Sequence, residues 1–264
     1  MKTYDLIVTN GCSFVSFPFL TFRTKSEHKI IHEKGGASLV NDLQFGMLLA
    51  KKFDCASINL AKNGSSNERI FRTTFNFLNY KKFSIPFPKV KSYQYDDKKD
   101  YQNILCIIGL SDFMRGEIYN SESKRYLRNN SPGQLAKTKK LQFSKGIEKF
   151  SKTYFTYFHD KDEKKKITER NMILFDSYCK TKNIDLFYFS SFTDNPIVDG
   201  LNYIKFPKDS IGYYGDDRLC WSDYIRTYCD EYANKTWSSH PTIDDHNIFA
   251  NYLFDYFKDV NYEM

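Results

Sequence analysis

Short apolar runs alternate with longer amphipathic segments along this chain, and this alternation limits the folds open to it. The runs have the length of buried strands, whereas the longer segments carry apolar residues at helical spacing. We expect strands at residues 5–9, 55–61, 103–110 and 184–192. We expect helices at residues 37–53, 65–78, 167–183 and 242–259. The order predicts an α/β protein, a three-layer α/β/α sandwich around a mostly parallel sheet of roughly five strands.

Length and composition fit one domain. With 41% hydrophobic and 17% aromatic residues, the 264-residue chain is not disordered and can bury a sizeable core. We therefore expect a single domain over residues 1–264. Two stretches fall outside the alternation. Residues 81–102 contain two prolines and much charge and are predicted to form an excursion loop, and the polar, lysine-rich residues 116–166 are predicted to form an insertion or lid with a helix around 134–158.

The six cysteines predict free thiols rather than a disulfide framework or a zinc site. None stands in a CxxC pair, and Cys55, Cys106 and Cys179 lie within apolar runs. Only Cys220 and Cys229 remain candidates for a disulfide pair.

The first residues turn polar too quickly for a signal peptide, and no apolar run approaches ~18 residues. We expect a soluble protein of a reducing, cytoplasmic compartment.

The net charge of +7 comes mostly from scattered lysines. A solvated lysine surface explains this pattern, and non-specific attraction to nucleic acid or to an anionic surface is the alternative. Because the positive charge does not form one arginine-rich stripe, we expect no specific nucleic-acid partner. We also expect no insertion into a membrane.

Three stretches fall at the carboxyl ends of expected strands, namely TNGCSF (9–14), AKNGSSN (61–67) and GLSDFMR (109–115). The carboxyl ends of parallel strands meet at one edge of a sheet, where ligands bind. In the first stretch, Gly11 is expected to let the chain turn sharply and to lift the hydroxyl of Ser13 to this edge. Cys12 should point the other way, into the packing, although it is an alternative nucleophile.

A serine hydroxyl is a poor nucleophile until a base takes its proton, so a histidine must come near Ser13. His240 is the best candidate, because it lies in a polar loop just before the last expected helix. His159 stands in a charged stretch and is expected at the surface. His246 falls in the first turns of the last helix and could support the site from behind.

Four blocks, in this order, resemble the motifs of the SGNH hydrolases (the GDSL esterase and lipase superfamily) in the short form often met in phage and viral proteins. They are NGCSF (10–14), NLAKNGSSNERIFR (59–72), IIGLSDFMRGE (107–117) and SSHPTIDDHNIFANYL (238–253). The resemblance implies a flavodoxin-like fold and a serine esterase, with Ser13 as nucleophile and His240 as base. It also implies three donors to the oxyanion: the N–H of Ser13, the N–H of Gly64 and the side chain of Ser111.

The third block departs from the family, which usually has Asn where this chain has Ser111. A hydroxyl can donate one hydrogen bond, but it is shorter than the amide. Asn67 or Asp112 could be recruited nearby, and Asp112 would donate only when protonated. Arg115 and Glu117 could pair with each other or help to frame the pocket.

The fourth block departs as well. The family has an acid two or three positions before the histidine, and these positions hold Trp237 and Ser238 here. Asp194 or Asp244 could supply the acid from elsewhere. Alternatively, a Ser–His dyad could work with a backbone carbonyl that holds the imidazole ring.

The resemblance implies a hydrolase of ester bonds, most of all of acetyl groups on carbohydrate, without a metal or an organic cofactor. The alternative is a catalytically weak or inactive SGNH-like module that binds glycan or has a structural role in a virus, so that the protein would be associated with a virion. Aromatic segments such as YFTYF (154–158) and IGYYGDD (211–217) would then be candidate stacking platforms for sugars.

Overall fold

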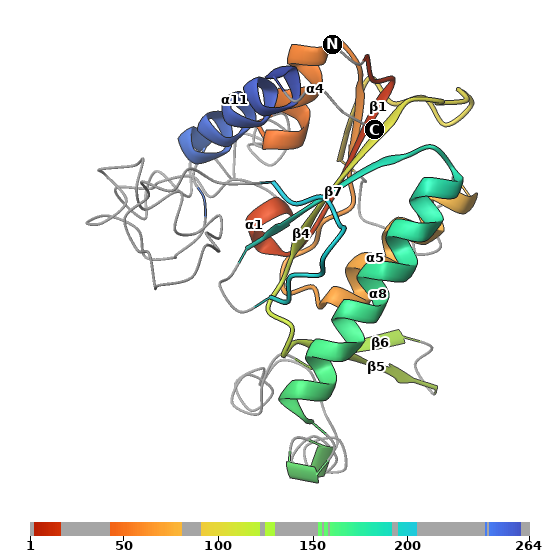
Figure 1. Cartoon of the computed structure of the whole chain (residues 1–264), viewed down its shortest axis with the longest axis vertical. Coiled ribbons are helices and arrows are strands. Elements are labelled where there is room, and N and C mark those ends of the chain that lie inside the picture. The colour runs from red at the N-terminus through yellow and green to blue at the C-terminus, as the bar shows by residue number, and fades with distance from the viewer. Residues whose placement is uncertain are drawn as a thin grey trace, which may run out of the picture.

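Five strands form one sheet in the order β3-β2-β1-β4-β7 (Figure 1). The computed structural model describes residues 3–16, 43–80, 91–121, 125–129, 153–154, 156–157, 159–191, 195–204, 241 and 243–259. The strands, in sheet order, are Lys91–Tyr93 (β3), Ala56–Asn59 (β2), Leu6–Asn10 (β1), Ile104–Leu110 (β4) and Asp185–Ser190 (β7). Four of them run parallel, and β3 pairs antiparallel with β2.

The parallel strands end within three residues of one another along the register. Thr9 of β1 pairs with Asn59 of β2, and Asn10 pairs with Ile108 of β4. Taken alone, the parallel strands have the order 2-1-3-4 along the sheet, which is that of a flavodoxin-like, doubly wound fold. The order reverses between β1 and β4, and in such sheets ligands bind outside the carboxyl ends of the strands at this point.

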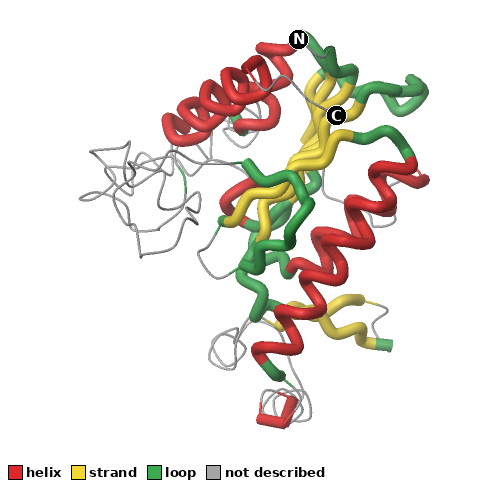
Figure 2. Tube along the Cα trace, in the orientation of Figure 1, coloured by secondary structure: helices red, strands yellow, loops and turns green. Residues whose placement is uncertain are grey.

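Helices cover both faces of the sheet (Figures 1 and 2). Phe45–Phe53 (α4) and Ile243–Asp259 (α11) pack on one face, and Asn67–Tyr80 (α5) and Lys161–Thr181 (α8) pack on the other. Alternate side chains of β1 belong to the two cores, because Ile7 lies in the same core as Phe249 of α11 and Val8 in the same core as Met172 of α8. The predicted three-layer α/β/α sandwich is confirmed.

Most expected elements occur within a few residues of their predicted bounds. Of the helix expected at 37–53, residues 37–42 lie outside the described part. Ser66 caps α5, since its hydroxyl accepts a hydrogen bond from the N–H of Arg69 at 3.3 Å. The helix α8 begins earlier than predicted, because the side chain of Asp160 accepts from the N–H of Glu163 at 2.8 Å and caps the first turn there.

The excursion loop predicted at 81–102 is corrected in part. Residues 91–93 form the edge strand β3, in which Tyr93 pairs with Ser57. This strand carries one large apolar side chain and therefore lacks the alternation that identifies a strand in a sequence.

The region predicted as an insertion, 116–166, begins with a β-hairpin. Gly116–Asn120 (β5) and Arg125–Asn129 (β6) pair antiparallel in a separate two-stranded sheet. Of the helix expected around 134–158, residues 153, 154, 156 and 157 are helical and residues 130–152 lie outside the described part. The single domain and the role of the insertion as a lid stay predictions.

The described cysteines are buried free thiols, as predicted; they are Cys12, Cys55, Cys106 and Cys179. Burial raises the pKa of the Cys55 thiol to about 12, and the nearby carboxylates of Asp5 and Asp54 contribute to this rise to a smaller extent. Cys220 and Cys229 lie outside the described residues.

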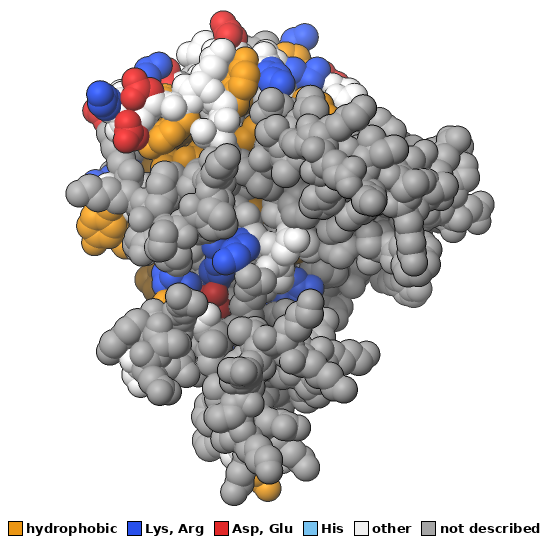
Figure 3. All heavy atoms as spheres, turned by 180° about the vertical axis from the view of Figure 1, so that it is seen from behind, with side chains coloured by type: hydrophobic (Ala, Val, Ile, Leu, Met, Phe, Trp, Pro, Cys, Tyr) orange, Lys and Arg blue, Asp and Glu red, His pale blue; other side chains and the backbone are white. Residues whose placement is uncertain are grey.

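Surface charge agrees with the scattered pattern of the sequence. Seen from behind, the described Lys and Arg side chains appear in several separate places (Figure 3). The expected absence of a specific nucleic-acid partner stays a prediction. Among the helices of the described part, none is both long and apolar enough to span a membrane.

Helix α4 packs very closely on β1 at Gly46. A Cβ atom added to Gly46 would lie 2.6 Å from Cγ2 and 2.9 Å from Oγ1 of Thr9. A methyl group does not fit in this space unless one of the two elements moves.

We expect Gly46→Ala to lower the free energy of unfolding by about 1–3 kcal/mol, because the added methyl group overpacks this contact. In an exposed helix the same change would stabilise by roughly 1 kcal/mol. Adding Thr9→Ala should recover much of the loss. Urea unfolding of the wild type, the single variant and the double variant measures both effects. A Gly46→Ala protein as stable as the wild type would show that α4 does not pack on β1 in this way.

Candidate functional site

Ser13 stands at the carboxyl edge of the sheet, directly after the central strand. It is the first residue of the short helix Ser13–Ser16 (α1). The carbonyl of Cys12 accepts hydrogen bonds from the N–H groups of Val15 (3.1 Å) and Ser16 (3.0 Å), which closes the turn. Cys12 is fully buried in the core on the α4 and α11 side, as expected, and Ser13 is 6% exposed.

Gly11 is required for space rather than for a sharp turn, which corrects the expectation. Among the described glycines, those with a positive φ are Gly64 and Gly200. A Cβ atom on Gly11 would lie 2.4 Å from Cγ2 of Val15 and 2.9 Å from the carbonyl oxygen of Gly109. The end of β1 therefore approaches both α1 and β4 more closely than any other residue would allow.

The amide of Asn10 fastens the end of β1 to α5. Its Nδ2 donates to the carbonyl of Ile70 (3.0 Å) and to the hydroxyls of Thr73 (2.9 Å) and Thr74 (2.8 Å). Its Oδ1 accepts from the N–H of Gly11 at 2.8 Å. The chain is thus held three residues before Ser13 by a fully buried side chain.

A second amide, that of Asn59 at the end of β2, holds α1. Its Nδ2 donates to the carbonyl of Val15 (2.8 Å) and to Oε1 of Gln44. Gln44 in turn donates from Nε2 to the carbonyl of Ser16 at 2.6 Å. Two carbonyls of α1 are therefore satisfied by side chains from neighbouring segments.

Gly64 lies in a tight turn after β2, with φ of +68°. Glycine adopts this left-handed conformation at no steric cost. The hydroxyl and the N–H of Ser65 donate to the carbonyl of Lys62 at 2.6 and 3.1 Å, which closes the turn. The N–H of Lys62 donates to the carbonyl of Gly11 at 3.2 Å, so the turn is docked on the segment that leads to Ser13.

Ser111 follows β4 and is held by Asn67, the first residue of α5. The N–H of Ser111 donates to Oδ1 of Asn67 (2.8 Å), and Nδ2 of Asn67 donates to the carbonyl of Ser111 (3.2 Å) and to Oδ1 of Asn195 (3.3 Å). Asn195 follows β7 and donates to the hydroxyl of Ser190 at 2.8 Å. The amide of Asn67 therefore fixes Ser111 in place and ties it to the segment after β7.

Arg115 and Glu117, for which a mutual ion pair was one of two alternatives, have different partners. Arg115 donates to the hydroxyl of Ser111 at 3.0 Å, whereas Glu117 accepts from Arg72 of α5 at 2.7 Å. Glu117 lies on β5, and its side chain faces α5 instead of the loop that carries Arg115. The carboxylate of Asp112 accepts from the N–H of Met114 at 2.9 Å, which stabilises the turn between Ser111 and Arg115.

The proposed base and its acid partner cannot be located in the described part. His240 and Asp194 lie outside the described residues, and Asp244 belongs to α11 with a side chain that is not described. His246 is fully buried, accepts from the N–H of Phe45 at 3.1 Å and stacks on its ring. It supports the start of α4.

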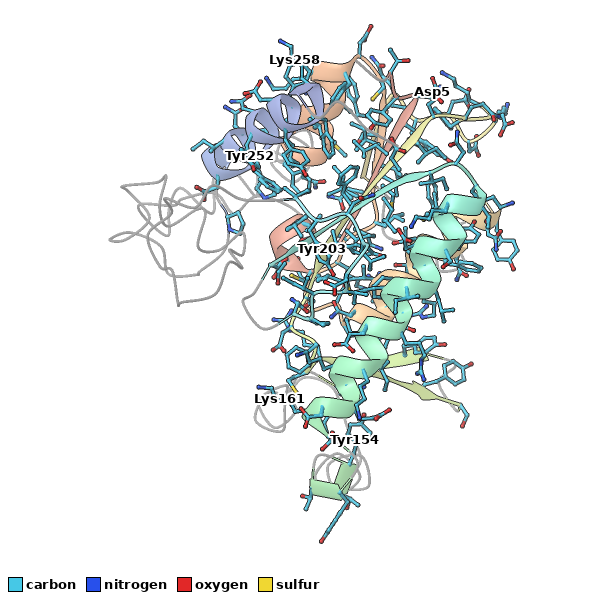
Figure 4. The ribbon with its side chains drawn as sticks, viewed as in Figure 1. Asp5, Tyr154, Lys161, Tyr203, Tyr252 and Lys258 are labelled. Atoms are coloured by element: carbon cyan, nitrogen blue, oxygen red, sulfur yellow. The ribbon has the colours of Figure 1, made fainter. Side chains whose placement is uncertain are left out.

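His159 is not a free surface residue, contrary to expectation. It is half-buried, and its Nε2 donates to the carbonyl of Met114 at 2.9 Å. This contact joins the segment before α8 to the loop after β4. Figure 4 labels Tyr154 and Lys161 at this end of α8, and Asp5 at the opposite edge of the sheet.

The sequence did not reveal the buried amides Asn10, Asn59 and Asn195. A signal was present for the first two, since each is a polar residue at the end of a buried strand. Among the described residues, no group of three or more His, Cys, Asp and Glu side chains could hold a metal ion.

We expect Asn67→Asp to lower the free energy of unfolding by about 1–3 kcal/mol or more, because a carboxylate oxygen would face the carbonyl of Ser111 without a proton to share. The matched control is Asn251→Asp on the exposed side of α11, where little change is expected. Urea unfolding compares the two. Equal stabilities for both variants would contradict the role of Asn67.

Comparison with known proteins identifies a family. The model of a family described as "Family of unknown function (DUF6071)" matches residues 32–261, which is most of the chain. No curated protein matches the chain.

Three solved structures of esterases are similar at low identity. The first is a carbohydrate esterase whose active site displays divergent catalytic and non-catalytic binding functions (14% identity, TM-score 0.47, 99% of this chain and 67% of that chain). The second is a carbohydrate esterase family 2 enzyme plus carbohydrate binding domain from Corynascus thermopiles (Myceliophthora fergusii) (10%, 0.41, 97% and 65%). The third is an acetyl xylan esterase from the rumen bacterium Butyrivibrio proteoclasticus (10%, 0.41, 98% and 64%). This chain spans about two thirds of their length.

Proposed function

The chain belongs to the DUF6071 family, and we propose that it is a serine hydrolase that acts on ester bonds. Ser13 attacks the acyl carbon while His240 takes the hydroxyl proton as general base and then gives it to the leaving alcohol as general acid. Negative charge develops on the carbonyl oxygen. It is stabilised by hydrogen bonds from the N–H groups of Ser13 and Gly64 and from the hydroxyl of Ser111. Water then hydrolyses the acyl-serine by the same route.

The observation that supports this proposal most is the position of Ser13 and Ser111. They follow β1 and β4, the two strands between which the strand order reverses. A doubly wound sheet binds its ligand at this point. The turn that contains Gly64 lies on the segment before Ser13, because the N–H of Lys62 donates to the carbonyl of Gly11.

The substrate that we propose is a carbohydrate ester, with acetyl as the acyl group, as the SGNH resemblance implies. Either Asp194 or Asp244 supports the imidazole of His240, or the site works as a Ser–His dyad. Removing the acid from a triad can lower the rate by as much as ~10⁴. An inactive module that binds glycan is the second candidate, because Trp237 and Ser238 stand where SGNH hydrolases have their acidic residue.

We expect a fluorophosphonate probe to label the wild-type chain once, because an activated serine attacks phosphorus as it attacks an acyl carbon. Ser13→Ala and His240→Ala should both abolish the adduct, which intact-mass spectrometry detects. Cys12→Ala is the matched control, and it should keep the adduct because Cys12 packs in the core.

An adduct that persists in Ser13→Ala would place the reactive group elsewhere and contradict the proposal. No adduct on the folded wild type, under conditions where a known esterase is fully labelled, would favour the glycan-binding module.

A further inference from the structure

Arg115 contacts Ser111, the one proposed oxyanion donor that differs from the residue usual in SGNH hydrolases. The hydroxyl of Ser111 is fully buried, and Oγ accepts a hydrogen bond from Nη1 of Arg115 at 3.0 Å. Arg115 itself is half-buried at the end of the turn that follows β4.

The chemistry of the two groups fixes the direction of the hydroxyl proton. A guanidinium carries donors and no acceptor, so Oγ of Ser111 must accept in this contact. The single proton of the hydroxyl then points away from Arg115. Within the described part of the chain no atom accepts this proton. A hydroxyl whose proton points away from the guanidinium has that proton to offer to a ligand oxygen.

Neighbouring bonds hold this pair in place before any ligand arrives. The amide of Asn67 engages both backbone groups of Ser111. The N–H of Arg115 donates to the carbonyl of Asp112 at 3.1 Å, and this turn brings the guanidinium back over Ser111. A donor held in advance stabilises a developing charge without reorganisation at the moment of reaction.

We propose that Arg115 is a positioning residue that makes the Ser111 hydroxyl a charge-assisted donor to the oxyanion. A hydrogen bond from a cation is stronger than a neutral one, and a hydroxyl that accepts such a bond becomes a better donor itself. Arg115 thereby compensates for the side-chain amide that SGNH hydrolases usually have at the position of Ser111. This inference rests on the proposed function, because it assigns Ser111 a role in that reaction.

The test is a double-mutant cycle with hydrolysis of p-nitrophenyl acetate as the readout. We expect Ser111→Ala to lower kcat by about 10²-fold, as for other oxyanion donors. Arg115→Ala should lower kcat by roughly 10-fold with KM nearly unchanged. The substitution weakens the hydrogen bond from the Ser111 hydroxyl to the oxyanion, which forms only in the transition state. The double variant should be no slower than Ser111→Ala alone.

Two further variants separate this role from a structural one. Arg115→Lys keeps a cationic donor and should lose less of kcat than Arg115→Ala, and it serves in the cycle if Arg115→Ala fails to fold. Arg170→Ala, on the exposed side of α8, is the matched control and should behave as the wild type. Circular dichroism confirms that each variant is folded.

The outcomes separate the two proposals. If turnover depends on Ser13 but the effects of Arg115→Ala and Ser111→Ala multiply, or Arg115→Ala changes KM alone, the role of Arg115 is refuted and the hydrolase stands. If Ser13→Ala leaves turnover unchanged, the proposed function fails and the role of Arg115 fails with it.

Discussion

The side-chain amide of Asn10 ties the end of the central strand to α5, and the geometry of the carboxyl edge depends on this connection. Its donors reach α5, and its oxygen holds the N–H of Gly11, two residues before Ser13. The same helix begins with Asn67, which holds both backbone groups of Ser111 after β4. One helix therefore fixes the residues that follow two neighbouring strands, so Ser13 and Ser111 keep a constant relation to each other.

Close packing makes this edge rigid. A Cβ atom on Gly11 or on Gly109 would lie 2.4 or 2.6 Å from Cγ2 of Val15, so α1 rests directly on the backbone of β1 and β4. Buried amides away from water must be fully hydrogen-bonded, and a satisfied network in a medium of low dielectric constant holds its members firmly. These are the conditions under which donors stabilise charge without moving. Packing and polarity together therefore suit this edge to the acyl chemistry that we propose.

The sequence predicts the features that depend on near neighbours and misses those that depend on distant partners. The order of strands and helices and the cap at Ser66 follow from local patterns, and so do the residues that reach the carboxyl edge. The pairing of Glu117 with Arg72 joins a hairpin to a helix that comes much earlier in the chain. No spacing rule predicts such a pair, and the same holds for the bond of Asn67 to Ser111. The edge strand at 91–93 was missed because it carries a single large apolar side chain.

The most direct test of the account is a crystal structure of the protein after reaction with a fluorophosphonate. The phosphorus would stand in for the tetrahedral acyl carbon, and its free oxygen for the oxyanion. We predict a covalent bond from Oγ of Ser13, with the free oxygen about 2.7–3.1 Å from the N–H groups of Ser13 and Gly64 and from the hydroxyl of Ser111. An adduct on another residue, or a free oxygen that points away from Gly64 and Ser111, would contradict the account.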